Sequence, residues 1–428
     1  MAAVAAMSLG ALAACGSSTS GDDAKGKVYY LNFKPEAADQ WTALAKEYTK
    51  EKGVEVKVQT AASGTYEQTL KSEIAKTEAP TLFQVNGPVG YQNWKKYTAD
   101  MSNTDVYKEL ANQDVALKDG DKVVGVPYVM ETYGLIYNKD ILNKYFALDG
   151  AKATSMDEID NFDTLKAVAD DMQARKDELG IKGAFTSAGF DSSSDWRFKT
   201  HLANLPLYYE FKDDNVTEQP AKIKGTYLPN YKKIFDLAIN NSAEDPTTLS
   251  TGGHDPATEF TSGKAAFFFT GSWDYATIAA AQKNTTMIPY YCGVSGEEKA
   301  GLNSGTENRL AINDAASDED KKATMDFWLW LVTDPEASKE MVAQLGVLPY
   351  TDAAKGDNGY LNKAEELSKA GNYTMDWATN YQPNVDQYRK GLVSALNAYT
   401  ADQSDANWDT FKTAFVDGWA QNYKTENA

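Results

Sequence analysis

The chain of 428 residues has few of the side chains that ligate metals or form disulfides. It holds two cysteines, Cys15 and Cys292, and two histidines, His201 and His254. One cysteine belongs to the N-terminal leader, and no Cys/His group has zinc spacing, so a disulfide framework and a zinc finger are excluded. We therefore expect Cys292 to be a small buried apolar residue and the protein to need no metal and no cofactor.

The motifs of nucleotide binding and of common hydrolases are also missing. The chain contains no G-x-x-x-x-G-K-[ST], G-x-G-x-x-G, G-x-S-x-G or H-E-x-x-H. Basic residues are outnumbered, with 42 Lys and Arg against 61 Asp and Glu and a net charge of −19. Phosphate backbones would be repelled, so nucleic-acid binding is disfavoured. No stretch reaches the about 20 apolar residues that span a bilayer.

Aromatic residues, in contrast, are abundant. The chain has 25 tyrosines and 9 tryptophans. Their side chains join a broad apolar face to a polar group, which suits ligands that are half apolar. The alternative is that they fill a large core, since a chain of this length predicts two domains or one large two-lobed unit.

The N-terminus has the features of an export signal. Residues 1–14 form a short run of small apolar residues, and Leu12-Ala13-Ala14-Cys15 resembles a bacterial lipobox, in which the cysteine becomes a lipidated N-terminus. Residues 16–26 are rich in Gly, Ser and Asp and predict a flexible tether. We expect a signal segment at 1–15 and a protein anchored through Cys15 on the outer face of a bacterial membrane, with the long polar tether favouring a Gram-positive cell.

The pattern after the tether alternates between strands and helices. We predict strands at 27–33, 54–60 and 81–85 and helices at 37–52 and 66–76, then helices at 161–179, 228–240 and 382–423, with a buried strand at 265–270. This order predicts an α/β fold with a largely parallel sheet. In such sheets ligands bind beyond the carboxyl ends of the strands, where loops 32–36 and 86–90 lie.

The capped segment after residue 316 predicts one more helix. Ser317 is a suitable N-cap, and the acids that follow it lie at the positive end of the helix dipole. The helix is expected to end at Thr333, before Asp334-Pro335. Its Trp328 and Trp330 fall in an apolar run, and we expect both in the core.

Several segments resemble the carbohydrate-binding family of extracellular solute-binding proteins of bacterial ABC importers, which includes maltodextrin-binding proteins. The matching segments, in order, are Ala79–Phe83 with Gly90-Tyr91, Val129–Asp140 (VMETYGLIYNKD), Phe260–Trp273 (FTSGKAAFFFTGSW), Asn303–Asn313 with the helix at 317–332, Gly346–Pro349 and Tyr381–Asn384. The resemblance implies a periplasmic-binding-protein-like fold of type II: two α/β lobes joined by three crossover segments, with a cleft between the lobes.

The same resemblance implies where the crossovers and the lobes lie. It places the crossovers at 129–140, 260–273 and 303–313, and the residue pattern itself indicates a passage out of the first lobe at 125–138. The expected division is 27–129 with 271–315 in the N-lobe and 130–270 with 316–428 in the C-lobe, with Thr270-Gly271-Ser272 as a hinge.

The family also implies ligand contacts at particular residues of this chain. Trp273 matches a stacking tryptophan, Glu131 matches a cleft carboxylate, and Lys34 and Glu36 lie where charged sugar contacts are found. Asp191, Asp195 and Trp196 occupy a loop that supplies a carboxylate and an aromatic, in a polar segment that also holds Arg197 and His201.

Other candidate residues follow from local sequence features, or from positions where the chain differs from the pattern of maltodextrin-binding proteins. Tyr66 begins a helix after a glycine loop and fits a cleft or a core equally. Gly305 and Glu307 are candidate rim contacts before the third crossover. Asn86-Gly87 replaces an Asp-Arg pair of maltodextrin binders, and Gly391-Leu392-Val393 replaces a second stacking tryptophan, so a linear α-glucan is not assigned.

We expect a monomeric, non-catalytic binder of an oligosaccharide that closes on its ligand and delivers it to the permease subunits of an ABC importer. Two alternatives stay open. One is a surface glycoside hydrolase, which would need two suitably spaced carboxylates among the 61 acidic residues. The other is a binder of another solute, such as a polyol, a glycerophosphodiester or a peptide.

Overall fold

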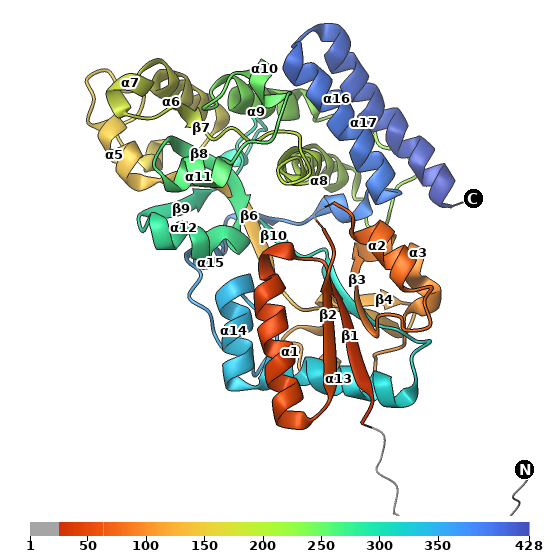
Figure 1. The fold of residues 1–428 in the computed structure, drawn as a ribbon. Helices are drawn as coiled ribbons and strands as arrows, with labels where there is room; N and C mark the ends of the chain where they lie inside the picture. The colour runs from red at the N-terminus through yellow and green to blue at the C-terminus, as the bar shows by residue number, and fades with distance from the viewer. Residues whose placement is uncertain (1–24, 63, 428) are drawn as a thin grey trace, which may run out of the picture.

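The computed structural model describes residues 25–62 and 64–427, in two α/β lobes (Figure 1). The predicted signal segment 1–15, its lipidation site Cys15 and most of the predicted tether lie outside the described residues. Each lobe is built on a six-stranded sheet. The predicted fold of two α/β lobes is confirmed.

The first lobe, at the bottom of Figure 1, contains a mixed sheet in the order β2-β1-β3-β11-β5-β4. Its strands are β1 (Lys27–Asn32), β2 (Glu55–Thr60), β3 (Leu82–Asn86), β4 (Leu117–Asp119), β5 (Lys122–Pro127) and β11 (Asn308–Ile312). Its helices are α1 (Ala38–Lys52), α2 (Tyr66–Glu73), α3 (Gly87–Trp94), α4 (Asp105–Lys108), α13 (Asp318–Thr333) and α14 (Pro335–Leu345). Strands β2 and β3 both run parallel to β1, whereas β11 is antiparallel to its neighbours.

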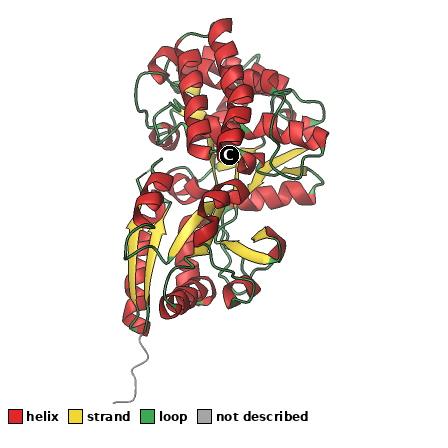
Figure 2. Ribbon diagram, turned by 90° about the vertical axis from the view of Figure 1, so that its right-hand side faces the viewer, coloured by secondary structure: helices red, strands yellow, loops and turns green. Residues whose placement is uncertain are grey.

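The second lobe has its own sheet, in the order β12-β10-β6-β8-β7, with β9 paired to β6. Its strands are β6 (Glu131–Asn138), β7 (Gly183–Phe185), β8 (Ala265–Gly271), β9 (Thr285–Ile288), β10 (Ala300–Gly305) and β12 (Tyr373–Met375). Its helices are α5 (Lys139–Phe146), α6 (Phe162–Ala174), α7 (Lys176–Leu179), α8 (Asn204–Asp214), α9 (Leu228–Asn240), α10 (Pro246–Leu249), α11 (Pro256–Thr261), α12 (Tyr275–Ala281), α15 (Gly359–Lys369), α16 (Val385–Ala401) and α17 (Asp405–Glu426). The second lobe therefore holds most of the helices (Figure 2).

Local signals in the sequence explain where several elements begin and end. Helix α1 ends at Gly53, which adopts φ +66°, a left-handed conformation that glycine reaches without strain. Ser317 caps α13, because its side chain accepts a hydrogen bond from the Asp320 backbone N–H at 3.1 Å. Both predictions are confirmed, as is the end of α13 at Thr333.

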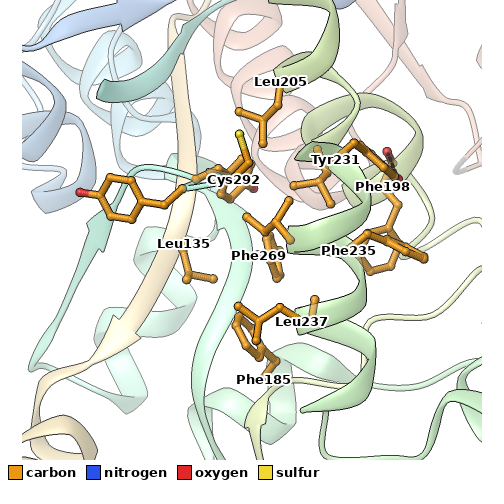
Figure 3. Packing of buried hydrophobic residues seen from close by; sticks show 14 of the residues in the cluster. Leu135, Phe185, Phe198, Leu205, Tyr231, Phe235, Leu237, Phe269 and Cys292 are labelled. Carbon is orange, nitrogen blue, oxygen red and sulfur yellow. Dashed lines mark hydrogen bonds between the residues drawn. The ribbon is translucent and has the colours of Figure 1, made fainter. Parts of the chain in front are cut away.

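The buried side chains form separate cores in the two lobes. In the first lobe, Trp328 and Trp330 of α13 pack against the sheet, as predicted. In the second lobe, Phe267 and Phe269 of β8 are buried, and Cys292 lies in the same cluster (Figure 3). Cys292 is thus the small apolar residue that the sequence predicts, and burial raises the pKa of its thiol.

The chain passes between the lobes three times, but one passage differs from the predicted position. The first, between β5 and β6, and the one between β10 and β11 lie where predicted. The segment 260–273 does not cross: β8 pairs with β6 up to Gly271, and the chain then turns through α12 and returns as β9 on the same sheet. The remaining passage follows α14 and leads to α15, which packs under the second sheet.

This path corrects the expected division of the chain between the lobes. Residues 271–305 belong to the second sheet, because β9 and β10 both pair with β6. Residues 318–350 belong to the first lobe, because the apolar faces of α13 and α14 are buried in its core. Thr270-Gly271-Ser272 is consequently part of a buried strand end in the second lobe and not a passage between lobes.

Within the described part of the chain, no helix has both the length and the apolar character needed to cross a membrane.

Candidate binding site

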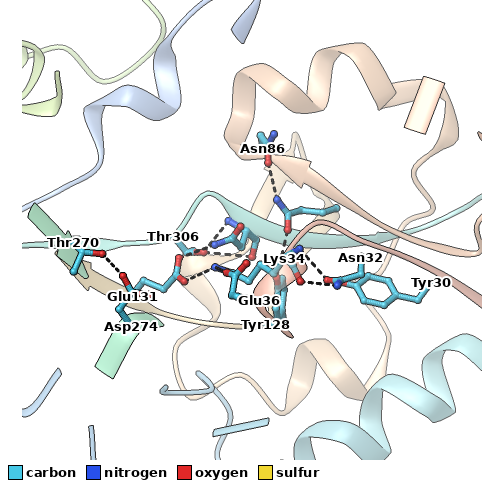
Figure 4. A network of polar contacts seen from close by, with 12 residues as sticks. Tyr30, Asn32, Lys34, Glu36, Asn86, Tyr128, Glu131, Thr270, Asp274 and Thr306 are labelled. Carbon is cyan, nitrogen blue, oxygen red and sulfur yellow. Dashed lines mark hydrogen bonds and ion pairs between the residues drawn. The ribbon is translucent and has the colours of Figure 1, made fainter. Parts of the chain in front are cut away.

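Lys34 lies at the carboxyl end of β1, at the junction of the two lobes. Asn32 holds this loop, since its Oδ1 accepts from the Lys34 N–H at 3.0 Å and its Nδ2 donates to the Lys34 carbonyl at 2.7 Å. The Lys34 Nζ then lies 2.7 Å from Glu131 Oε1 and 3.4 Å from Glu36 Oε1 (Figure 4). The Glu36 side chain is 42% exposed and that of Glu131 only 3%, so the ion pair with Glu131 is the buried one.

Glu131 is the first residue of β6, and it contacts the first lobe with both carboxylate oxygens. The Nδ2 of Asn308, at the start of β11, donates to Glu131 Oε2 at 2.8 Å, while Lys34 contacts Oε1. Burial alone would lower the pKa of Lys34, but the carboxylates of Glu131 and Glu36 outweigh burial and raise it. Lys34 therefore stays charged and, with Glu131, ties the second sheet to the first lobe. We call Lys34, Glu131 and Asn308 the hinge network.

Trp273 follows β8 on the short helix η6 (Ser272–Asp274), and its ring is only partly buried. The ring lies over Gly271: a Cβ added there would be 2.3 Å from Trp273 Cη2 and 2.7 Å from the Thr132 carbonyl oxygen. A side chain at this position would displace the ring. The absence of a side chain at Gly271 therefore leaves room for the Trp273 ring at the end of the strand, and Lys34 Nζ lies 6.0 Å from the ring centre.

Three further rings gather beside Trp273. The His201 ring stacks on Tyr133 with ring centres 4.1 Å apart, and lies 5.0 Å from Trp273. Trp377 lies 5.2 Å from Tyr133. We call Tyr133, His201, Trp273 and Trp377 the aromatic cluster. Burial, followed by the positive charges of Arg197 and Arg389, lowers the pKa of His201 well below its usual value, so its imidazole is neutral.

The aromatic cluster contains polar atoms without partners. Tyr133 Oη, His201 Nδ1 and Trp377 Nε1 are buried and make no hydrogen bond to any described residue. A buried hydroxyl or N–H that lacks a partner costs on the order of 1–3 kcal/mol. Three such atoms around one set of rings are therefore available to hydrogen-bond a ligand that carries hydroxyl groups.

The predicted loop at 191–196 lies against this cluster. The Trp196 ring is 5.6 Å from that of Trp273, and the Arg197 guanidinium covers Trp196 at 4.0 Å. Asp195 is buried and forms an ion pair with Lys199 at 2.7 Å. Burial raises the pKa of Asp195, although Lys199 opposes this.

Asp191 is held by the loop itself. Its Oδ1 accepts hydrogen bonds from the backbone N–H and the hydroxyl of Ser193, while its Oδ2 is buried without a partner. Burial lowers the pKa of Arg197 to about 10, and its Nε donates to the Phe269 carbonyl at 2.8 Å. This bond to β8 fixes the position of the arginine beneath Trp196.

Three predicted residues have structural contacts that explain them without a ligand. The Tyr66 hydroxyl bonds both the carbonyl and the N–H of Gln84, at 3.1 and 2.6 Å, so this tyrosine anchors α2 to β3. Asn86 accepts from Gln84 Nε2 at 2.7 Å. At Gly305 a Cβ would lie 3.2 Å from Trp377, so the absence of a side chain leaves room for that ring.

Glu307 belongs to a second group of charges at the junction. Its carboxylate pairs with Arg389 of α16 at 3.1 Å, and Gln382 Oε1 accepts from Arg389 Nε at 2.6 Å. Glu67 of α2 accepts from Trp94 Nε1 at 2.9 Å. Burial, and then the carboxylate of Asp386, raises the pKa of Glu67 to about 7, against the opposing effect of Arg389.

The junction thus brings together most of the predicted residues. Lys34, Glu131 and Trp273 meet around the end of β1 and the start of β6, and the 191–196 loop joins them from the second lobe. Sequence reasoning missed Glu67, Trp377, Asp386 and Arg389, which follow no local motif. The scarcity of arginine was an available signal: the chain has four, at positions 175, 197, 309 and 389, and two of them lie here.

Residues 43–363 match the family model of bacterial extracellular solute-binding proteins. The chain belongs to this family. Among curated proteins, none matches this solute-binding protein in sequence.

Solved structures share its fold at low sequence identity. A family 1 extracellular solute-binding protein from Bifidobacterium longum subsp. infantis is 20% identical, with a TM-score of 0.60 over 92% of this chain and 100% of that one. An ABC substrate-binding protein from Listeria monocytogenes, in complex with cycloalternan, is 18% identical, with a TM-score of 0.67 over 94% and 98%. A sugar transporter protein from Bacillus licheniformis, in complex with stachyose, is 14% identical, with a TM-score of 0.65 over 92% and 100%.

The family match confirms the predicted family, and the likeness to solved structures confirms the two-lobed fold.

Proposed function

We propose that this solute-binding protein captures an oligosaccharide at the junction of its lobes and delivers it to the permease subunits of an ABC importer. The observation that carries the proposal is the aromatic cluster, where flat rings and unpartnered polar atoms lie beside carboxylates. A pyranose offers apolar C–H faces to such rings and hydroxyls to such atoms. The structural relatives bound to cycloalternan and stachyose support a sugar ligand for this chain as well.

The contacts of each site residue indicate the part that it would play in binding a sugar. Trp273 and Trp196 offer aromatic faces, Tyr133 and His201 offer polar atoms, and Asp191 offers a buried carboxylate oxygen. Lys34 and Glu131 stand at a passage between the lobes, where a change in their contacts would accompany opening or closing. Closure around a ligand is the change that a permease can recognise.

Isothermal titration calorimetry against neutral oligosaccharides of different linkage and length tests this proposal. We expect saturable binding of at least one of them, and a marked loss of affinity in Trp273→Ala. If none binds, or if Trp273→Ala binds the best ligand as tightly as the parent protein, the assignment of the site is wrong.

A surface glycoside hydrolase is the second candidate, and one observation favours it. Glu67 has a pKa near 7, the property that a general acid needs, and it is coupled to the carboxylate of Asp386. The proposed binder has no such reaction, so incubation with the best ligand should return it intact by mass spectrometry. Cleavage products that disappear in Glu67→Gln would establish the hydrolase instead.

We also propose that Cys15 is lipidated and tethers a monomer to the outer face of the membrane. The lipobox-like sequence before Cys15 and the membership of an extracellular family support this. Labelling of expressing cells with a palmitate analogue should mark the parent protein and not Cys15→Ala. Equal labelling of both proteins would contradict the anchor.

A further inference from the structure

A buried asparagine of the second sheet lies beside the aromatic cluster. Asn303 of β10 pairs with Tyr133 of β6. Tyr133 pairs on its other side with Gly271 of β8, over which the Trp273 ring lies. Directly opposed residues of an antiparallel pair have their side chains on the same face of the sheet. The Asn303 side chain therefore lies on the face that carries Tyr133 and the Trp273 ring, and it is fully buried there.

The orientation of the Asn303 amide is fixed by Asn204, the buried first residue of α8. The Thr379 N–H donates to Asn204 Oδ1 at 3.2 Å, and Asn204 Nδ2 donates to the Asp376 carbonyl at 2.9 Å. Because a backbone N–H only donates and a carbonyl only accepts, these two bonds determine which end of the Asn204 side chain is the amino group. Asn204 Nδ2 also lies 2.9 Å from an atom of Asn303, which must therefore be the acceptor, Oδ1.

The amino end of Asn303 is left without a partner. Its Nδ2 carries two N–H donors, yet it is buried and makes no hydrogen bond to any described residue. Trp377 Nε1 is in the same state, and Trp377 lies within the segment 376–379 that Asn204 also holds. Asn204 thus fixes two parts of the chain that each carry an unused buried donor. A buried N–H without a partner is unfavourable, and an acceptor brought by a ligand would relieve it.

We propose that Asn303 is a ligand-binding residue, whose Nδ2 donates to an oxygen of the bound sugar, and that Asn204 is the residue that positions it. This inference rests on the proposed function and adds a binding residue and its support to the same site. Because Asn303 Oδ1 is engaged by Asn204, only the donor end of the amide is left for the ligand. The group that it binds must bring an acceptor, such as a hydroxyl oxygen or the carbonyl oxygen of an acetamido group.

The first test removes the donor. Raffinose, stachyose, cycloalternan and triacetylchitotriose are titrated into the protein by calorimetry near neutral pH, and the probe that binds best is carried forward. Asn303→Leu removes the amide, whereas Asn303→Asp keeps the oxygen that accepts from Asn204 and loses the amino group. We expect each variant to bind the probe at least fivefold more weakly than the parent protein, because the ligand oxygen then lacks its donor.

The second test separates positioning from general support of the fold. Asn204→Leu should also weaken binding at least fivefold. Asn303→Leu added to Asn204→Leu should then cost less than twofold, because the amide is no longer held in place. The matched control is Asn241→Leu: Asn241 is buried in the same lobe, and its Nδ2 donates to Asp170 Oδ1 and to the Leu237 carbonyl, both at 3.0 Å. The control should lower the urea midpoint and leave the affinity for the probe unchanged.

The possible results distinguish this inference from the proposed function. If a probe binds and both Asn303 variants bind it with less than a fivefold loss, the role of Asn303 is overturned while the sugar-binding function stands. If the losses in Asn204→Leu and Asn303→Leu multiply in the double variant, Asn204 does not act through Asn303. If none of the four probes binds the parent protein, the proposed function fails, and this inference fails with it.

Discussion

Two carboxylates at the junction of the lobes, Glu131 of the hinge network and the half-buried Glu67 of α2, differ in how their charge is balanced. Glu131 has Lys34 at 2.7 Å and Asn308 at 2.8 Å, so both its oxygens are satisfied within the protein. Glu67 receives hydrogen bonds from Trp94 and Asn86 and forms no ion pair with a described residue, although the charge of Arg389 partly offsets its raised pKa. Removal of one partner from a buried ion pair leaves the other charge uncompensated, whereas a carboxylate without an ion pair responds to its surroundings by a raised pKa.

The difference also separates stability from binding. The contacts of Glu131 join residues that are distant in the chain, and their loss exposes a buried lysine to an apolar surrounding. The hydrogen bonds of Glu67 stay within the first lobe, and its pKa is raised first by burial and then by the carboxylate of Asp386 from the other lobe. Substitution of Glu131 should therefore act mainly on folding, and substitution of Glu67 mainly on the pH dependence of stability.

The largest effect is expected from Glu131→Ala. Removing one partner of a buried ion pair leaves the other charge uncompensated, which costs about 3–5 kcal/mol. Urea unfolding followed by circular dichroism should show a loss of this size, and Lys34→Met in the same chain should restore part of it. A double variant no more stable than Glu131→Ala would mean that the lost stability comes from other contacts of Glu131.

Next in size is Trp273→Ala, which should weaken ligand binding by about 1–3 kcal/mol because a well-placed aromatic face is lost. Gly271→Ala should weaken binding too, since its Cβ would displace the Trp273 ring. Tyr423→Ala in α17 is the matched control for loss of an aromatic ring. Calorimetry with the best ligand measures all three, and unchanged affinity in Gly271→Ala would show that the ring position does not matter.

Most elements of the fold could be predicted, because their signals are local. The alternation in 55–60, the Gly53 stop and the Ser317 cap each act within a few residues, and each was found where expected. The lobe to which residues 271–305 belong could not be predicted from the sequence. It depends on β9 and β10 pairing with β6, and nothing within 271–305 specifies that partner.

The residues of the candidate site also fall into a group that the sequence predicts and a group that it does not. Lys34, Glu131 and Trp273 lie at element ends that a family pattern marks, so they could be named from the sequence. Arg389 and Glu67 lie inside helices, and their significance comes from partners far along the chain: Glu307 is 82 residues from Arg389. Whether a carboxylate has a cationic partner depends on which side chains the fold brings near it, and a linear sequence does not show that.

The pH dependence of stability should distinguish Glu67 from the hinge network. The pKa of Glu67 is about 7 in the folded protein against an ordinary value of 4.5, so the folded state binds the proton more tightly. Its contribution to stability is full below pH 4.5 and is lost as the pH rises through 7. The loss should be on the order of 1–3 kcal/mol. Glu67→Gln should remove this slope from urea midpoints measured across the range, and a parent protein whose midpoint rises with pH over it would contradict the assignment.

The smallest effect on stability is expected from Glu36→Gln. This variant tests whether a carboxylate stabilises the fold merely by lying near the Lys34 ammonium group. Glu36 lies 3.4 Å from the same Lys34 ammonium as Glu131, but its side chain is 42% exposed. Water screens such a pair, so its loss should cost about 0.5 kcal/mol or less, and the cost should shrink further in high salt. Unfolding of Glu36→Gln and Glu131→Gln under the same conditions gives the comparison. Equal losses in the two variants would mean that neither burial nor the added hydrogen bond from Asn308 strengthens the Lys34–Glu131 pair over the Lys34–Glu36 pair.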